Sequence, residues 1–189
     1  IASIEDDSPV IFLEHRWLYN ISGPVPEEMY RVPLGTARVM REGKDITIVA
    51  TSYMALEAFR ASEMLAEQGV SAEVVDIRSL RPWDKTTVMA SVSKTRRVIV
   101  TDTSWAAVGF SAEVVACIAE QGLSLLTPPQ RVCLPDNPTP TSAALAAHYY
   151  PRAVDLATTA ASMVGVSFSA PSGEDIPLDV PDMSFTGPF

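Results

Sequence analysis

The sequence has few of the features that mark membrane proteins, secreted proteins or nucleic-acid binders. No apolar run approaches the roughly 18 residues that a membrane-spanning helix needs. The opening residues, IASIEDDSPV, lack the basic and apolar regions of a signal peptide. No Lys/Arg cluster is longer than the pair Arg96 and Arg97, and the formal net charge is −9. These properties argue against nucleic acid and anionic membranes as partners, and an acidic surface favours basic partners.

Signatures of metal binding and phosphate binding are also missing. The two cysteines, Cys117 and Cys133, form no CxxC pair, and we expect them to be small buried apolar residues in a reducing cytoplasm. The two histidines, His15 and His148, are too far apart in sequence to indicate a metal site. Neither GxGxxG nor GxxxxGK[ST] occurs, so the sequence gives no local support for a phosphate-binding loop.

The first part of the chain predicts a domain boundary. Residues 9–15, PVIFLEH, are an apolar run that ends in charge, which indicates the end of a β-strand. The following residues contain three prolines in a short space and are predicted to be extended. We therefore assign residues 1–20 to the end of a preceding domain and residues 21–44 to a linker. The start without Met is expected for a piece or a processed form of a longer protein.

From residue 45 to residue 166 strand and helix patterns alternate. A buried strand is predicted at residues 45–51 and further strands at 71–77, 96–102 and 130–136. Helices are predicted at 52–69, from 84 through 92, and at 109–122, 142–150 and 151–165. Ser52 and Asp84 are candidate N-caps, and Pro151 is a candidate first-turn residue. Alternation of this kind implies right-handed crossovers and a mostly parallel sheet covered by helices on both faces.

The stretch VVDIRSLRPWD, residues 74–84, shows how one of these strands should end. Its apolar half belongs in a sheet that is covered on both faces, because such strands show little alternation. Arg78 and Arg81 are expected to lead the chain into solvent or against an acidic neighbour. Pro82 prevents the strand from continuing, and Asp84 begins the next helix.

Few residues are candidates for chemistry. Glu14 and His15 follow the first apolar run, and carboxyl ends of strands in open α/β sheets often line ligand crevices. The alternative is a hydrogen-bonded structural histidine. The segment GFSAE, centred on Ser111, is similar to the turn that carries a hydrolase nucleophile but lacks its final glycine. A helix N-terminus that packs closely on its surroundings explains it as well.

Asp102 ends the third predicted strand and leads into the loop TSWAAVG. An exposed tryptophan in such a loop often anchors an interface, so Asp102 and Trp105 are possible interface residues. Packing of Trp105 against a helix of its own chain is the open alternative.

The order of these segments resembles the β subunit of the decarboxylating component of 2-oxo-acid dehydrogenases, a thiamine-diphosphate family that includes pyruvate, branched-chain and acetoin dehydrogenases. The segments that carry the resemblance are PVIFLEHRWLYN, VPLGTARVMREGKDITIVATS, EVVDIRSLRPWD, VIVTDTSWAAVGFSAEV and RVCLPDNPTPTSAAL. The resemblance implies that residues 1–20 end a pyrimidine-binding domain. Residues 45–166 would then be a transketolase-like C-terminal domain, of fold class α/β with three α/β/α layers and a mostly parallel sheet.

The same resemblance implies that the chemistry lies elsewhere. Thiamine diphosphate and Mg²⁺ would be held by other parts of the intact enzyme, and none is expected for this chain alone. No catalytic, cofactor-binding or metal-binding residue is carried over, since Glu14 comes too late in the family pattern to be the cofactor-activating glutamate. The implied partners are an α subunit, a second β subunit and the subunit-binding domain of an acyltransferase. EHRWLYN and TPTSAALAAHYYP depart from the best-known members, which leaves the 2-oxo acid open.

A doubly wound module that binds a small ligand by itself is the alternative from a different class. It predicts a pocket at a topological switch point of the sheet. The tail, residues 167–189, carries acids and no base and is expected to be extended or loosely attached. It is interpreted as a docking segment for a basic partner with Phe189 as an apolar anchor, or as a solvated tail along the chain's own surface. Its acids are Glu174, Asp175, Asp179 and Asp182.

Overall fold

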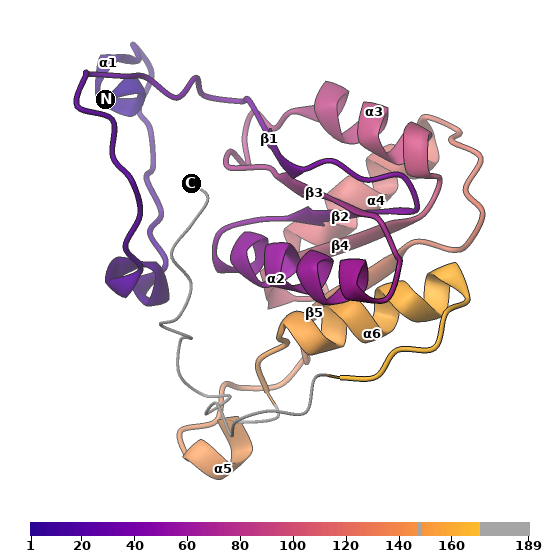
Figure 1. Ribbon diagram of the computed structural model, residues 1–189. Coiled ribbons are helices and arrows are strands. Elements are labelled where there is room, and N and C mark those ends of the chain that lie inside the picture. The colour runs from indigo at the N-terminus through magenta and orange to yellow at the C-terminus, as the bar shows by residue number, and fades with distance from the viewer. Residues whose placement is uncertain (147–148, 171–189) are drawn as a thin grey trace.

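The computed structural model describes residues 1–146 and 149–170 (Figure 1). One five-stranded sheet lies at its centre, in the order β1-β3-β2-β4-β5. The strands are β1 (Arg38–Arg41), β2 (Ile46–Ala50), β3 (Ala72–Asp76), β4 (Val98–Trp105) and β5 (Gln130–Leu134). β2 to β5 run parallel, and only β1 is antiparallel to its neighbour β3.

Helices cover both faces of this sheet. The helices are α1 (Ala2–Glu5), the 3-10 helix η1 (Arg16–Asn20), α2 (Tyr53–Glu67), α3 (Lys85–Thr95), α4 (Phe110–Glu120), α5 (Ala143–Ala146) and α6 (Ala153–Val164). One apolar core joins α2 and α6 to the sheet, and a second joins α3 and α4 to it. Figure 1 shows these helix pairs on opposite sides of the strands. The predicted α/β fold with three layers is confirmed.

The predicted strand ending at residues 74–84 is confirmed as well. Val74, Val75 and Ile77 are fully buried. Asp84 caps α3: one carboxylate oxygen accepts a hydrogen bond from Thr87 N at 3.0 Å, and the other accepts one from Ala37 N at 3.0 Å. The second bond draws the segment before β1 against the start of α3, so this one aspartate serves both the helix and the edge of the sheet.

The linker prediction was wrong at its C-terminal end, because residues 38–41 form the edge strand β1. Val39 and Met40 point to opposite faces and pack against the two separate cores. This alternation covers only two apolar residues between arginines. Such a strand exists because β3 offers a free edge, which cannot be read from the segment itself.

The predicted strand at residues 9–15 was also wrong. These residues form no strand, and Ile11, Phe12 and Leu13 are 86%, 72% and 77% exposed. A single extended segment is stabilised only when another strand pairs with it, and none of the described residues does so here. The chain instead turns into η1, which packs on α2.

Two predicted helix starts need correction. Ser52 precedes α2, yet its side chain makes no capping hydrogen bond. Pro151 lies one residue before the N-cap of α6, which is Arg152. The predicted helix at 142–150 is seen as Ala143–Ala146 within the described residues, and residues 171–189 of the predicted tail lie outside them. None of the described helices is both long enough and apolar enough to cross a membrane.

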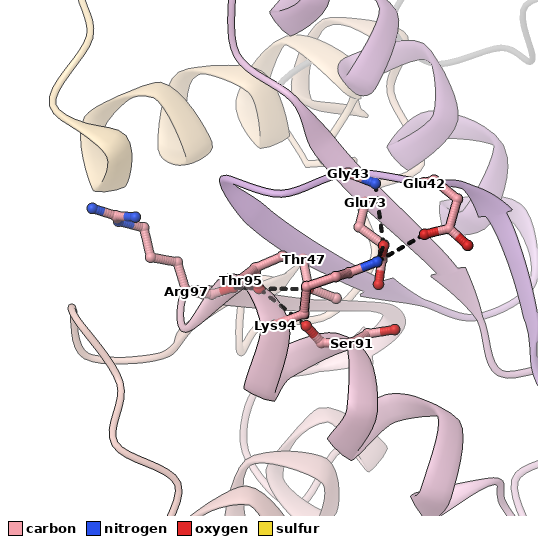
Figure 2. A network of polar contacts seen from close by, with 8 residues as sticks. All are labelled: Glu42, Gly43, Thr47, Glu73, Ser91, Lys94, Thr95 and Arg97. Carbon is pink, nitrogen blue, oxygen red and sulfur yellow. Dashed lines mark hydrogen bonds and ion pairs between the residues drawn. The ribbon is translucent and has the colours of Figure 1, made fainter.

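A polar network lies at the amino-terminal ends of β2 and β3 (Figure 2). Glu73 is buried on β3, where it contacts the Lys94 ammonium and accepts a hydrogen bond from Gly43 N at 3.1 Å. Lys94 also reaches Glu42 at 2.7 Å. Burial opposes the charge of Glu73, but hydrogen bonds from Lys94, Ser91 and Gly43 hold its pKa below the ordinary value. The network therefore joins the turn before β2 to β3 and α3.

Replacement of Lys94 by Met should destabilise the fold by about 2 kcal/mol, because it leaves a buried carboxylate without its cation, and the partial exposure of Lys94 reduces the loss. Chemical denaturation at pH 7 measures this. Since the pKa of Glu73 is depressed, its stabilisation is present above the ordinary value of 4.5 and is lost as the pH falls through the folded value. Lys44→Met, at an exposed lysine, is the matched control. Equal stability of the two variants would contradict this role for Lys94.

Candidate functional site

A cleft of about 410 Å³ opens at the carboxyl ends of the parallel strands. It is lined by the start of α2, by the second half of β4 and the end of β5, by the two residues before the N-cap of α6, and by the segment that leads into η1 with the first residues of η1. The lining residues are Glu14, His15, Arg16, Trp17, Tyr53, Met54, Asp102, Thr103, Leu134, Tyr150 and Pro151. The predicted crevice residues Glu14 and His15 thus lie together with the predicted interface residue Asp102.

The topology explains why a cleft lies here. β2 and β4 are neighbours in the sheet, but the helix that follows β2 packs in one core and the helix that follows β4 packs in the other. The two connections leave the sheet on opposite faces, and a crevice opens between them. This is the topological switch point at which open α/β sheets generally bind ligands.

An aromatic cluster, consisting of His15, Trp17, Tyr53 and Tyr150, forms one wall of the cleft. His15 stacks on Tyr53 with ring centroids 5.3 Å apart. Trp17 meets Tyr53 edge-on at 5.2 Å and Tyr150 at 5.2 Å. At these separations the rings pack on one another rather than enclose a space. The cluster therefore fixes η1 to the start of α2 and to the residues before α6.

Electrostatics within this wall favour a neutral His15. Its Nδ1 accepts a hydrogen bond from Trp17 N at 3.3 Å, which puts the proton of the neutral ring on Nε2. Burial lowers the pKa of His15, because the charged form loses hydration. Glu14 faces solvent and accepts a hydrogen bond from the Tyr19 hydroxyl at 2.7 Å. The histidine thus has a structural role as part of a packed wall, and its Nε2 is its remaining donor.

A buried carboxylate, that of Glu57, fixes the start of α6 next to the aromatic cluster. Glu57 on α2 is 1% exposed and accepts a hydrogen bond from Ala153 N, at the first turn of α6, at 2.7 Å. Arg152 lies 3.4 Å from the same carboxylate and stacks over the Trp17 ring at 5.8 Å. Arg60 also pairs with Glu57 at 3.4 Å. Glu57 therefore positions the start of α6 and, through Arg152, the aromatic cluster.

Glu57, Arg152, Tyr53 and Tyr150 were not among the residues predicted from sequence. Glu57 carried a usable signal, since it lies four residues after Tyr53 and four before Ala61 on the buried side of α2. A glutamate on the apolar face of a helix is rarely buried without a partner. Which residue pairs with it could not be read from the sequence, because the partner lies far along the chain.

Asp102 is buried and acts within its own chain. One oxygen accepts hydrogen bonds from Ser104 N at 2.9 Å and from the Ser104 hydroxyl at 2.6 Å, and the other accepts one from Ser111 N at 2.8 Å. The second contact places a carboxylate at the N-terminus of α4, where the helix dipole favours negative charge. Its predicted interface role remains a prediction.

Ser111 is fully buried, with its Oγ 3.2 Å from Cys133 Sγ. Among the described residues the Ser111 hydroxyl is bonded to Cys133, while the Asp102 carboxylate accepts from Ser111 N and not from the hydroxyl, so the hydrolase interpretation gains no support. The other cysteine, Cys117, is buried as expected. Cys133 is only half-buried, and burial raises the pKa of its thiol.

Trp105 packs only partly against its own chain, and its predicted interface role remains a prediction. Its Nε1 donates to the Tyr149 hydroxyl at 3.2 Å, which packs one edge of the indole against its own chain. The side chain is nonetheless 47% exposed. Phe189, the remaining predicted interface residue, lies outside the described residues.

The described side chains that line the cleft are suited to binding a ligand or a chain segment and are not arranged as a catalytic site. Among residues 1–146 and 149–170, no three His, Cys, Asp or Glu side chains converge so that they could hold a metal ion. The described residues thus show no cluster of three side-chain ligands that could hold Mg²⁺ by themselves. Fold and site together define an open α/β domain whose crevice is completed by chain arriving from its N-terminal side.

A family model described as "Transketolase, C-terminal domain" matches residues 35–156. The chain belongs to this family. It is 39% identical over 161 residues to the β subunit of acetoin:2,6-dichlorophenolindophenol oxidoreductase of Cupriavidus necator, covering 85% of this chain and 48% of the relative. It is 44% identical over 146 residues to the pyruvate dehydrogenase E1 component subunit β of Bacillus subtilis, covering 76% and 45%. The chain spans about half the length of these curated relatives.

Among solved structures, a split-gene transketolase in an inactive beta4 tetramer matches with a TM-score of 0.63 at 29% identity. The match covers 75% of this chain and 47% of that one. The resemblance to β subunits of 2-oxo-acid dehydrogenases, inferred from the order of sequence segments, is confirmed.

Replacement of Glu57 by Ala should destabilise the domain by about 3 kcal/mol, because it leaves Ala153 N–H and two arginines without their buried acceptor. Thermal or denaturant unfolding measures the loss. Glu63→Ala, at an exposed glutamate of the same helix, should change stability by less than about 0.5 kcal/mol. Similar losses in the two variants would show that Glu57 is not the anchor of α6.

Acidification should loosen η1 from α2. Because burial lowers the pKa of His15, the packed state is supported above the ordinary value of 6.5 and is weakened as the pH falls through the folded value. NMR titration of the two histidine rings, assigned with a His148→Gln variant, follows this. His15→Phe keeps a stacking ring without a titrating group and should remove the pH dependence. The other charged groups along the cleft are Glu14, Arg16 and Asp102. An unchanged pH profile in His15→Phe would assign the effect to one of them.

Proposed function

We propose that this chain is the C-terminal part of the β subunit of a thiamine-diphosphate-dependent 2-oxo-acid dehydrogenase, in which it serves subunit assembly and supports the active site. The observation that carries the proposal is the match to the transketolase C-terminal domain, together with relatives named as β subunits of acetoin and pyruvate enzymes. The chain covers their C-terminal domain and would be inactive alone.

Its cofactors and partners follow from that proposal. Thiamine diphosphate with Mg²⁺ would be held by other domains, since the described residues supply no donor set for the metal. The partners would be an α subunit and a second β subunit, and the similar split-gene protein, described as a beta4 tetramer, supports self-association. Docking of an acyltransferase subunit-binding domain and a cytoplasmic location are parts of the same proposal.

A small-ligand module remains the second candidate, and the cleft at the switch point is the observation that favours it. A volume of about 410 Å³ lies within the range of small-molecule sites. The two functions differ in what the cleft requires. Ligand binding needs open space between its walls, whereas assembly needs only the packed aromatic cluster that fixes the entering chain.

The chain alone should bind neither thiamine diphosphate nor a 2-oxo acid. Titration calorimetry with thiamine diphosphate plus Mg²⁺, and separately with pyruvate, should give no saturable heat. An intact α/β enzyme of the same family serves as the positive control. A saturable signal of micromolar affinity, about −8 kcal/mol, would contradict the proposal for the cofactor, and the same signal for pyruvate would favour the ligand module.

A further inference from the structure

A second cavity, a groove of about 430 Å³, lies apart from the cleft on the α4 side of the domain. Its walls are the second half of α4 and the segment that leads into β5, residues 123–129. The lining is apolar except for Thr127, and Leu126 in it is 51% exposed. The Thr127 hydroxyl is buried, and among the described residues it has no hydrogen-bond partner. A buried hydroxyl without a partner is unfavourable, so the groove lacks both a polar group and apolar cover.

Two arginines join this groove to the end of α6. Arg96 Nε donates to the Ser124 carbonyl at 2.9 Å, so its guanidinium rests on the segment that lines the groove. Arg97 Nε donates to the Met163 carbonyl, in the last turn of α6, at 3.1 Å (Figure 2). In the described part of the chain, both guanidinium groups bond only to carbonyl and hydroxyl oxygens. The longest basic cluster of an acidic chain thus has no carboxylate partner there.

The chain leaves α6 at the same end of the sheet as the groove. Gly165 ends the helix, and further on the Ser169 carbonyl accepts a hydrogen bond from Gln68 Nε2 at 3.0 Å. Gln68 lies between α2 and β3, at the amino-terminal end of the strands, where the groove-lining segment also enters β5. Residues 171–189 could span about 60 Å, whereas a domain of this size has a radius of gyration of about 15 Å. The groove is therefore within their reach.

The sequence of this last segment complements the groove. The stretch DIPLDVPD, residues 175–182, alternates apolar residues with acids and prolines. Proline favours an extended backbone for itself and for the residue before it. Alternate side chains of an extended chain point to opposite sides. Ile176, Leu178 and Val180 would then share one side, with Asp179 on the other.

We propose that residues 175–182 occupy the groove of their own chain, with their apolar side on its lining and their acids toward Arg96. A backbone N–H of the segment would supply the partner that the Thr127 hydroxyl lacks. Glu120, exposed at the end of α4, is the one acid among residues 115–129, so the charge beside the groove is set by the arginine pair. The contact goes beyond the proposed function, because it needs no other subunit.

Hydrogen exchange of the full 189-residue chain tests this contact. The backbone amides within residues 176–180 should exchange about tenfold or more slowly than in an unstructured peptide of the same sequence, because docking protects them. Leu178→Ser should abolish this protection. The same variant should also speed exchange within residues 123–127, since the groove loses its cover.

Variants of the groove test the same contact from the other side. Leu126→Ser and Arg96→Gln should each reduce the protection of residues 176–180 about tenfold. Leu80→Ser and Arg81→Gln are matched controls at exposed residues after β3, at the opposite end of the sheet, and should leave the protection unchanged. Exchange in β2 should be the same in every variant, which shows that each one folds. Raising the salt concentration should weaken the protection in the wild-type chain and less so in Arg96→Gln.

Three outcomes would overturn the proposal. Free exchange of residues 176–180 in the wild-type chain would show that the segment does not dock. Equal protection in Leu126→Ser and Leu80→Ser would place it on another surface. Protection that rises with protein concentration would identify a second copy of the chain, and not the same copy, as the source of the segment.

Discussion

The buried carboxylate of Glu57 is the constraint on which the arrangement around the cleft depends. A glutamate that is removed from water must be matched by donors, and Glu57 finds them in Ala153 N–H and in two arginines. Those donors lie on α6 and α2, so the charge can be satisfied only when the two helices are packed together. The same pairing holds Arg152 over the Trp17 ring, where its guanidinium packs against the aromatic cluster.

The cleft therefore consists of two kinds of wall with different origins. One wall is the sheet itself, where adjacent strands send their helices to opposite faces and leave a crevice. The other wall is chain that arrives from the N-terminal side and packs on α2 through aromatic rings. The packing of η1 on α2 fixes the entering segment beside the carboxyl ends of the strands. That property suits a subunit that supports an active site without supplying its catalytic groups.

Large apolar side chains are exposed at two places in the described part of the chain. Ile11, Phe12 and Leu13 are exposed on the entering segment, and Trp105 and Val108 are exposed on the β4–α4 loop. The two places differ in how far contacts within the described chain fix them. The entering segment lacks a strand to pair with among the described residues, while the loop is already held in its final shape by Gly109 and Arg131. Both are consistent with a chain that covers about half the length of its relatives.

The sequence by itself determined the succession of elements from β2 to α6 and several of their ends. The buried strands β2 and β3, the buried first half of β4 and the Asp84 cap were readable because their causes lie within a few neighbouring residues, in apolar composition and in capping chemistry. β5 is exposed or half-buried along its length. Only the tertiary structure decided the edge strand β1, the packing of η1, the partners of Glu57 and the groove beside α4. Each of these depends on a surface or a charge supplied from elsewhere along the chain, as with Glu57 and Ala153, which are 96 residues apart. A contact between such distant residues leaves no periodic signal in either segment, so it becomes visible only when the fold brings the two together.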